Sequence, residues 1–265
     1  MYIWKEFLEQ TRGKGLWLGM IVLILASLFL IAEARNFPAD LGFEAMLLSV
    51  FDMNIYLLPL FAMFLSSFSI FQEKELKTSM ILLTKKESHW SFLFKKSLSI
   101  QLVLIGLFLS SYLILAIFMK FFLEFHVLSF LYFILVMAIF LLIFNQLGIL
   151  LGTAASTKMQ LVGANILVWF FIVFLYDLMF LYFLPIVTTA NIRFFSWLYF
   201  LDPVHTMRFY LETSFGLFSL DQMSRIMEKF VFMDMNVFLL LNAVLWPVIL
   251  FLLTAAFRNG GTYND

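Results

Sequence analysis

The chain alternates long apolar runs with short polar stretches, and six of the runs are long enough to cross a bilayer. A spanning helix needs about 20 mostly apolar residues. Such stretches lie at about 16–34, 51–71, 98–119, 127–154, 161–184 and 236–257. Several are apolar on all sides, as lipid-embedded helices are, and none shows the short alternation of transmembrane strands. The pattern therefore predicts an all-α integral membrane protein with six transmembrane helices in a single domain, residues 1–265.

Composition supports this class. The chain is 63% hydrophobic and only 13% charged, with a mean hydropathy of +1.00, whereas soluble domains are about 25% charged. A soluble fold has too much surface to cover for so few polar side chains. The absence of cysteine excludes disulfides, thiol catalysis and thiolate metal sites.

The first run has a second interpretation. Basic residues precede it, and Ala32-Glu33-Ala34 resembles the cleavage site of a signal peptide. The run is longer than the apolar region of about 7–15 residues typical of such peptides. We therefore expect it to remain as the first span.

Basic residues indicate the orientation of the six spans. One side receives the N-terminus, 72–97, 155–160 and the C-terminus, with eleven Lys and Arg, while the other side receives six. Four of those six lie in the long segment 185–235, and long loops have little influence on orientation. We therefore expect a multi-pass protein of the plasma membrane with both termini in the cytoplasm.

The N-terminal residues 1–15 form the first of two notable cytoplasmic pieces. Apolar Tyr2, Ile3 and Phe7 alternate with charged residues at helical spacing, and Gly13 and Gly15 follow. This pattern is typical of a short amphipathic helix that lies in the membrane interface before the chain turns inward. An ordinary charged anchor before a span would show the same pattern.

The second piece is the loop between the second and third runs. Residues 71–96 hold six of the seventeen Lys and Arg residues, yet they also contain an apolar patch at 80–83. A short helix over 75–83 would place Leu76, Met80 and Leu83 on one face. Such a face with a charged rim suits a groove on a partner protein. Alternatively, the loop is a positive-inside connector whose apolar residues rest on lipid headgroups.

Several polar residues and glycines fall inside the predicted spans. A charged side chain such as Asp177 costs free energy inside the membrane, so it indicates either a transport role or a structural ion pair. Arg193 is close in sequence and could be the partner in such a pair. The amides Asn145, Gln146, Asn165 and Asn242 either line a path or bond across helices. Gly148 and Gly152 form a small-residue surface for close helix contact, within this chain or with a second one.

The outer segment 185–235 is too polar to span the membrane but is rich in aromatic residues. Its composition is typical of short interfacial or re-entrant helices. Asp202 and Arg208 either pair across a turn begun by Pro203 or belong to a helix that Asp202 caps and Pro203 begins.

Enzymatic and carrier functions find less support in these residues. His89, His126 and His205 all fall in predicted loops, so the spans lack the histidine that intramembrane hydrolysis by a metal or a serine would need. We expect no catalytic, cofactor or metal site and no nucleic-acid partner. A secondary carrier, a channel, and a non-transporting scaffold or immunity protein stay open as alternatives, although the paired halves common in carriers are not detectable.

The stretch "FQEKELKTSMILLTKKESHWSFLFKK" after the second span resembles the corresponding loop of ABC-2-type transporter permeases. The shared order is Glu73 and Glu75, then Lys77-Thr78, then Leu82-Leu83, then a basic residue before the third span. The Asp202-Pro203 pair with Arg208 is similar to an Asn-Pro…Arg motif in the subgroup of the nitrous-oxide-reductase maturation permease. Asp202 replaces the usual Asn, and Lys85-Lys86 stand where the family has Pro.

The resemblance implies a permease subunit that is not itself an enzyme and that works as a dimer with a second permease copy or a related chain. It implies an amphipathic elbow helix and a coupling helix between the second and third spans, both seated on a separate ABC ATP-binding subunit. The residues implied to contact that subunit are Trp4, Phe7, Glu73, Glu75, Leu76, Lys77, Thr78, Met80, Leu83, Lys85 and Lys86. The chain lacks a phosphate-binding Gly-x-x-x-x-Gly-Lys-Ser/Thr motif, so ATP and Mg²⁺ would bind in the partner, and the expected function is export.

Overall fold

The computed structural model describes residues 2–33, 42–76, 89–217 and 229–261. Within these ranges the chain is helical, and six stretches are long and apolar enough to cross a membrane. They are Lys14–Glu33, Gly42–Glu75, Trp90–Phe122, Val127–Ala154, Lys158–Ile186 and Met235–Phe257. The all-helical, six-span prediction is therefore confirmed.

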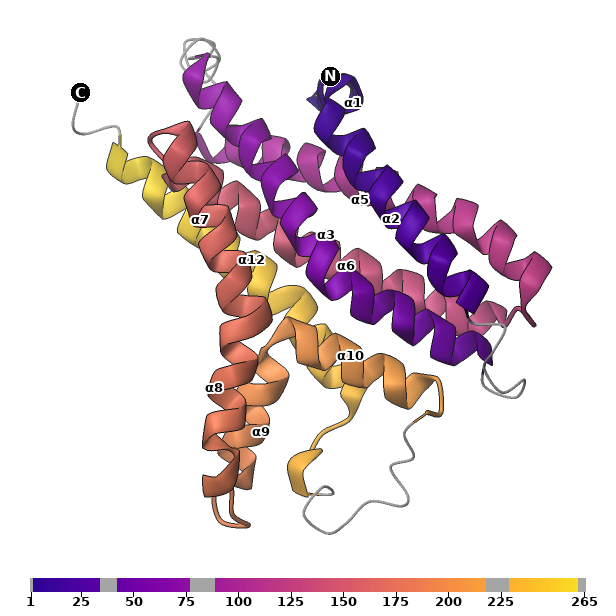
Figure 1. The fold of residues 1–265 in the computed structure, drawn as a ribbon. Helices are drawn as coiled ribbons and strands as arrows, with labels where there is room; N and C mark the ends of the chain where they lie inside the picture. The colour runs from indigo at the N-terminus through magenta and orange to yellow at the C-terminus, as the bar shows by residue number, and fades with distance from the viewer. Residues whose placement is uncertain (1, 34–41, 77–88, 218–228, 262–265) are drawn as a thin grey trace.

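Short helices complete the order along the chain (Figure 1). Helix α1 (Tyr2–Arg12) precedes α2 (Lys14–Glu33), and α3 (Gly42–Glu75), α5 (His89–Phe122) and α6 (Val127–Ala154) follow. The fifth span consists of α7 (Lys158–Phe170), a π-helical turn (Phe171–Leu175), α8 (Tyr176–Phe183) and a 3₁₀ turn (Leu184–Ile186). Helices α9 (Ile192–Leu201) and α10 (Pro203–Ser214) lead to α12 (Met235–Gly261).

Two helices begin about nine residues earlier than their apolar runs predict. Helix α3 starts at Gly42 rather than 51, and α5 starts at His89 rather than 98. The added turns contain Glu44 and Lys96, whose charges are paired by residues distant in sequence. At 1.5 Å per residue, these 34-residue helices are about 50 Å long, so they extend beyond a hydrocarbon layer of about 30 Å.

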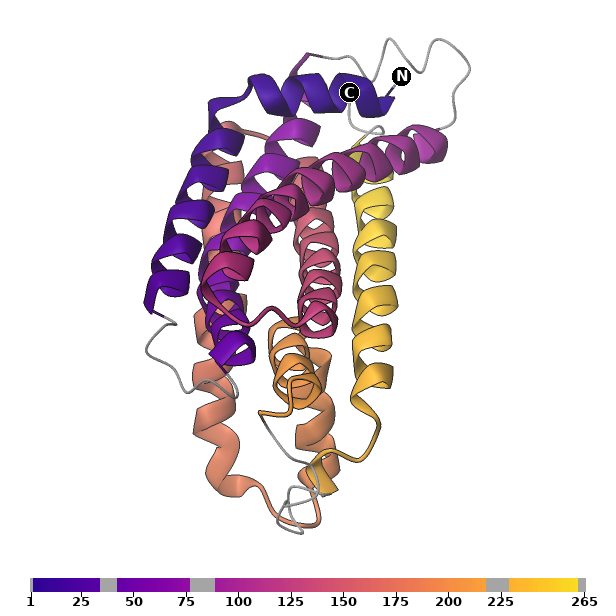
Figure 2. The same ribbon diagram turned by 90° about the vertical axis from the view of Figure 1, so that its right-hand side faces the viewer.

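Helix α6 lies at the centre of the bundle and contacts α3, α5, α10 and α12 (Figure 2). Gly148 and Gly152 allow α3 to approach closely. A Cβ atom at Gly148 would lie 2.1 Å from Ser66 Oγ, and one at Gly152 would lie 2.4 Å from the carbonyl oxygen of Ser67. The predicted small-residue surface therefore packs within this chain.

The fifth span is mostly uncovered by its own chain. Within Lys158–Ile186 only Leu161, Asn165 and Val173 are buried. Its second half, α8, runs beside α9 and projects beyond the end of the bundle that lies opposite α1 (Figure 1). This span is therefore the one that leaves most apolar surface for lipid or another chain.

Candidate functional site

The N-terminal helix α1 lies across the end of the bundle, against α5 and the start of α2 (Figure 2). Glu6 and Gln10, four residues apart, share the buried face of α1, whereas Ile3 and Trp4 are exposed. The predicted elbow helix is present. Its buried face is polar, however, and therefore requires polar partners from the bundle.

A buried ion pair supplies the main partner. The Lys96 Nζ atom of α5 lies 2.6 Å from Glu6 Oε2, and the two residues are 2% and 1% exposed. The other carboxylate oxygen of Glu6 accepts hydrogen bonds from Ser69 Oγ at 2.7 Å and from Gln10 Nε2 at 2.8 Å. Both oxygens of this buried carboxylate are thus satisfied, as a buried charge requires.

Glu73, near the end of α3, joins the same cluster. Its Oε1 atom lies 3.1 Å from Lys96 Nζ and 2.8 Å from Lys5 Nζ. Burial alone would lower the pKa of the Lys5 ammonium, but its hydrogen bond to Glu73 and the charges of Glu73 and Glu9 outweigh burial and raise that pKa. We call Lys5, Glu6, Glu73 and Lys96 the elbow cluster. It joins α1 to the end of α3 and the beginning of α5, the two helices that flank residues 77–88.

Two further contacts hold the end of α3 against the link between α6 and α7. The Lys74 ammonium donates to the carbonyl oxygen of Ala155 at 3.0 Å, and Glu75 pairs with Lys158 at 3.0 Å. Because the same short stretch also carries Glu73, the last turn of α3 is connected to three other elements.

The predicted partner-contact residues divide into three groups. Trp4 and Leu76 are 65% and 74% exposed, Glu75 is exposed, and Phe7 is half-buried and stacks on Trp4 with ring centroids 5.8 Å apart. Glu73 differs from the prediction, because it is buried and its contacts lie inside the chain. The remaining residues, Lys77, Thr78, Met80, Leu83, Lys85 and Lys86, and with them the predicted coupling helix, lie outside the described residues.

The buried amides bond across helices. Gln146 Oε1 accepts from Ser97 Oγ at 2.7 Å, and Asn145 Nδ2 donates to Gln101 Oε1 at 3.2 Å, which connects α6 to α5. Asn165 donates to Ser67 Oγ at 3.0 Å. Asn242 donates to the carbonyl oxygen of Phe200 at 2.8 Å. Of the two interpretations left open by the sequence, these contacts favour helix-to-helix bonding.

Asp177 has a partner that the sequence did not indicate. Its Oδ1 atom lies 3.2 Å from His205 Nε2, while His205 Nδ1 lies 2.6 Å from Asp202 Oδ2. The predictions that His89 and His205 lie in loops were wrong, because His89 begins α5 and His205 occupies the first turn of α10. Asp202 caps that helix by accepting from the backbone N–H of His205 at 2.9 Å, and Pro203 is the first residue of α10. The capping interpretation of Asp202 and Pro203 is thus the one observed.

Arg208 forms ion pairs with Asp52 and Glu212 rather than with Asp202. Its Nε atom lies 3.2 Å from Asp52 Oδ1 on α3 and 3.2 Å from Glu212 Oε1 on α10. Burial raises the pKa of Glu212, against the charge of Arg208, which lowers it. Asp52, like Glu6 and Lys96, was not singled out from the sequence, since each finds its partner far along the chain.

These contacts define two polar clusters at opposite ends of an apolar bundle, one of which surrounds the attachment of α1. Among the described residues, no group of three or more His, Cys, Asp or Glu side chains is arranged to hold a metal ion. The family model described as ABC-2 family transporter protein matches residues 2–258, which run from α1 into the last helix. No curated protein matches the chain significantly.

Proposed function

The chain belongs to the ABC-2 family of transporter proteins and is a membrane permease component of an ABC transporter; on this premise we propose that it is the permease subunit of an exporter. A separate ABC ATP-binding subunit, with its ATP and Mg²⁺, would supply the energy. The solute would be hydrophobic or amphipathic. Transport in this form requires a binding energy for the solute that differs between the two conformations of the permease.

The observation that carries the proposal is the elbow cluster. The predicted contact with the ATP-binding subunit runs from Glu73 to Lys86, between the end of α3 and the start of α5, and also includes Trp4 and Phe7 of α1. Glu6 and Lys96 attach α1 to the same two helices. A push on residues 77–88 and a push on the exposed face of α1 would therefore act on one connected unit.

The transmission of this movement follows from the packing of α3. The close approach of α3 to Gly148 and Gly152 of α6 leaves no room for sliding without displacing backbone atoms. Helices α3 and α6 would move together, and α10 and α12, which contact α6, would follow. Tilting of this group would change access for the solute from the cytoplasmic to the outer side.

A second permease, identical or related, would complete the transporter. The exposed apolar surface of the fifth span supports this dimer, because only three residues of this 29-residue span are buried within the chain. We place the protein in the plasma membrane with both termini in the cytoplasm, because the end that carries α1 also holds most of the basic residues.

The Asp202-Pro203 motif supports a place near the subgroup of the nitrous-oxide-reductase maturation permease. In that subgroup Asn stands where this chain has Asp202. Asn and Asp are about equally good helix caps, so the cap that Asp202 provides to α10 is compatible with either residue. The replacement of Asn by Asp202 is therefore compatible with the same capping role.

Co-purification from membranes in mild detergent tests the proposal. Wild-type chain should bring down an ATP-binding protein, and Leu76→Glu/Met80→Glu/Leu83→Glu should lose it. Leu128→Glu, at an exposed position near the opposite end of the bundle, is the matched control and should retain it. If folded wild-type protein brings down no ATP-binding chain, the proposal fails and a secondary carrier, a channel or a scaffold becomes the better interpretation.

A further inference from the structure

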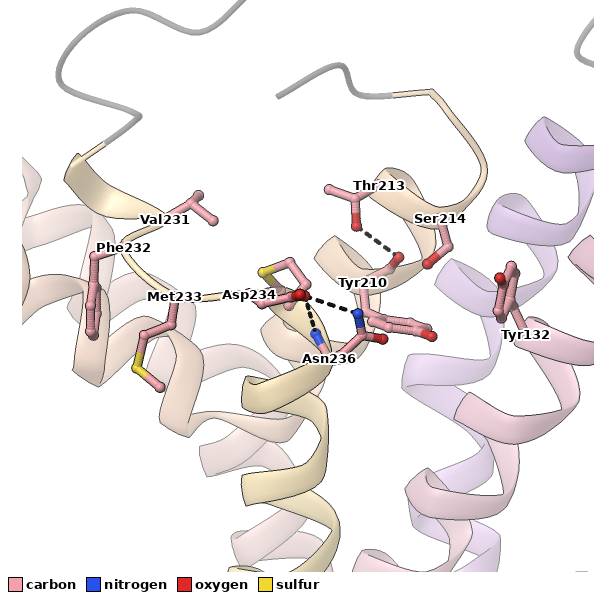
Figure 3. A pocket seen from close by; sticks show the side chains of 10 residues that line it. Tyr132, Tyr210, Thr213, Ser214, Val231, Phe232, Met233, Asp234 and Asn236 are labelled. Atoms are coloured by element: carbon pink, nitrogen blue, oxygen red, sulfur yellow. Dashed lines mark hydrogen bonds between the residues drawn. The ribbon is translucent and has the colours of Figure 1, made fainter. Parts of the chain in front are cut away.

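A cavity of about 610 Å³ lies at the end of the bundle opposite α1, where α6, α10 and the segment that leads into α12 meet (Figure 3). Its lining comes from Tyr132 of α6, from Tyr210, Thr213 and Ser214 of α10, and from residues 231–236. Sites for small molecules usually have volumes of about 300–1,000 Å³. The cavity is therefore large enough for a solute of ordinary size.

Its walls differ in chemistry. Val231, Phe232 and Met233 form an apolar side, whereas the four residues from α6 and α10 carry hydroxyl groups (Figure 3). The rings of Tyr132 and Tyr210 meet edge to face, with centroids 6.2 Å apart. Burial is the main cause that raises the pKa of Tyr210. The hydrogen bond with Ser214 lowers this pKa, and the charges of Tyr132 and Asp234 raise it further. The ring of Tyr210 presents the negative π-face that attracts cations.

The charge of the cavity comes from Asp234, an exposed carboxylate. Its Oδ1 atom accepts hydrogen bonds from the backbone N–H and the side-chain Nδ2 of Asn236, both at 2.9 Å. Neither donor is charged, so these bonds do not neutralise the carboxylate. The lining residues that the structure describes include no Lys, Arg or His. Among the described lining residues Asp234 therefore supplies the charge, and it lies beside an apolar wall.

We propose that this cavity binds an amphipathic organic cation, with its apolar body against Phe232 and Met233 and its ammonium group between Asp234 and the two tyrosines. The proposal goes beyond the transport function, since binding here requires neither an ATP-binding partner nor a conformational change. It can therefore be tested on the isolated chain, and its failure would leave the co-purification result untouched.

A purely structural role for Asp234 is the competing explanation. The carboxylate bonds to the backbone of Asn236 at the start of α12, so it acts as a cap for that helix. Asn caps helices about as well as Asp. Asp234→Asn therefore keeps the cap and removes the charge, which separates the two roles in one variant.

The test uses three probes with the same aromatic body: 1-pyrenemethylammonium (a cation), 1-pyrenemethanol (neutral) and 1-pyrenecarboxylate (an anion). Binding to the full chain in detergent is followed by fluorescence anisotropy for wild type, Asp234→Asn and Glu124→Gln. Glu124 is an exposed acid at the same end of the bundle and outside the cavity lining, so its variant controls for general surface charge. Comparing variants in the same detergent removes the contribution of probe dissolved in micelles.

Wild type should bind the cation more tightly than the neutral probe, and the anion most weakly. Asp234→Asn should reduce the preference for the cation about three- to fivefold, as expected for a partly exposed ion pair, while Glu124→Gln leaves it unchanged. A second variant, Tyr132→Leu, should weaken both the cation and the neutral probe. Equal binding of the three probes to wild type, or an unchanged preference in Asp234→Asn, would overturn the proposal.

Discussion

Removing the charge of Lys96 is expected to destabilise the protein strongly. Its ammonium lies 2.6 Å from Glu6 Oε2 and 3.1 Å from Glu73 Oε1, so Lys96→Met leaves two buried carboxylates with only the half-exposed Lys5 nearby. Breaking a buried ion pair by removing one partner costs about 3–5 kcal/mol. Glu6→Gln should cost less, because Lys96 keeps Glu73 and the amide can still bond to Ser69.

The double variant Lys96→Met/Glu6→Gln distinguishes a true pair from two independent residues. It removes both charges, so its loss should be at least about 1 kcal/mol smaller than the sum of the two single losses, as for residues in direct contact. Denaturant unfolding in mixed micelles would measure the four free energies, with Lys120→Met at an exposed position as the control. Additive losses, or a Lys96→Met variant as stable as wild type, would refute the buried pair.

Three further predictions concern the remaining contacts. Gly152→Ala places a methyl group 2.4 Å from a backbone carbonyl of α3 and should lower the free energy of unfolding by about 1–3 kcal/mol, as in an overpacked core. Gly163→Ala meets nothing within 4 Å and should leave that free energy unchanged. Since burial raises the pKa of Glu212 above its ordinary value of 4.5 despite Arg208, ionised Glu212 costs stability at pH 7. At pH 7 the free energy of unfolding of Glu212→Gln should therefore exceed that of wild type, and this difference should disappear as the pH falls to 4.5. A wild type that becomes more stable relative to the variant as the pH rises from 4.5 to 7 would contradict this. Asp202→Ala should lower the free energy of unfolding by about 1 kcal/mol, the usual loss for a removed cap, and Asp202→Asn should lower it by less. Equal losses in the two variants would speak against a capping role.

The sequence was informative where local pattern decides the structure. Long apolar runs predicted all six spans, and the alternation in residues 2–12 predicted α1. The early starts of α3 and α5 were missed, because Glu44 and Lys96 look like loop residues until their partners are known. Those partners are 82 and 90 residues away along the chain.

The same limit explains the errors at the polar cluster of Asp177, Asp202 and His205. Arg193 was considered as the partner of Asp177 because the two are close in sequence, whereas in the folded chain Asp177 contacts His205 of a later helix. The capping role of Asp202 could be predicted, since it depends on three adjacent residues and a proline. Local motifs were thus recoverable from the sequence, and long-range polar pairs were not.

The elbow cluster also bears on the order in which the protein is made. Glu6 emerges from the ribosome early, but its ammonium partner follows 90 residues later, in the third span. Until then α1 carries a carboxylate that has no place to be buried, so it must wait at the membrane surface in contact with water. Helix α1, which is synthesised before its partner, is therefore among the later elements to settle, and its docking follows the insertion of the third span.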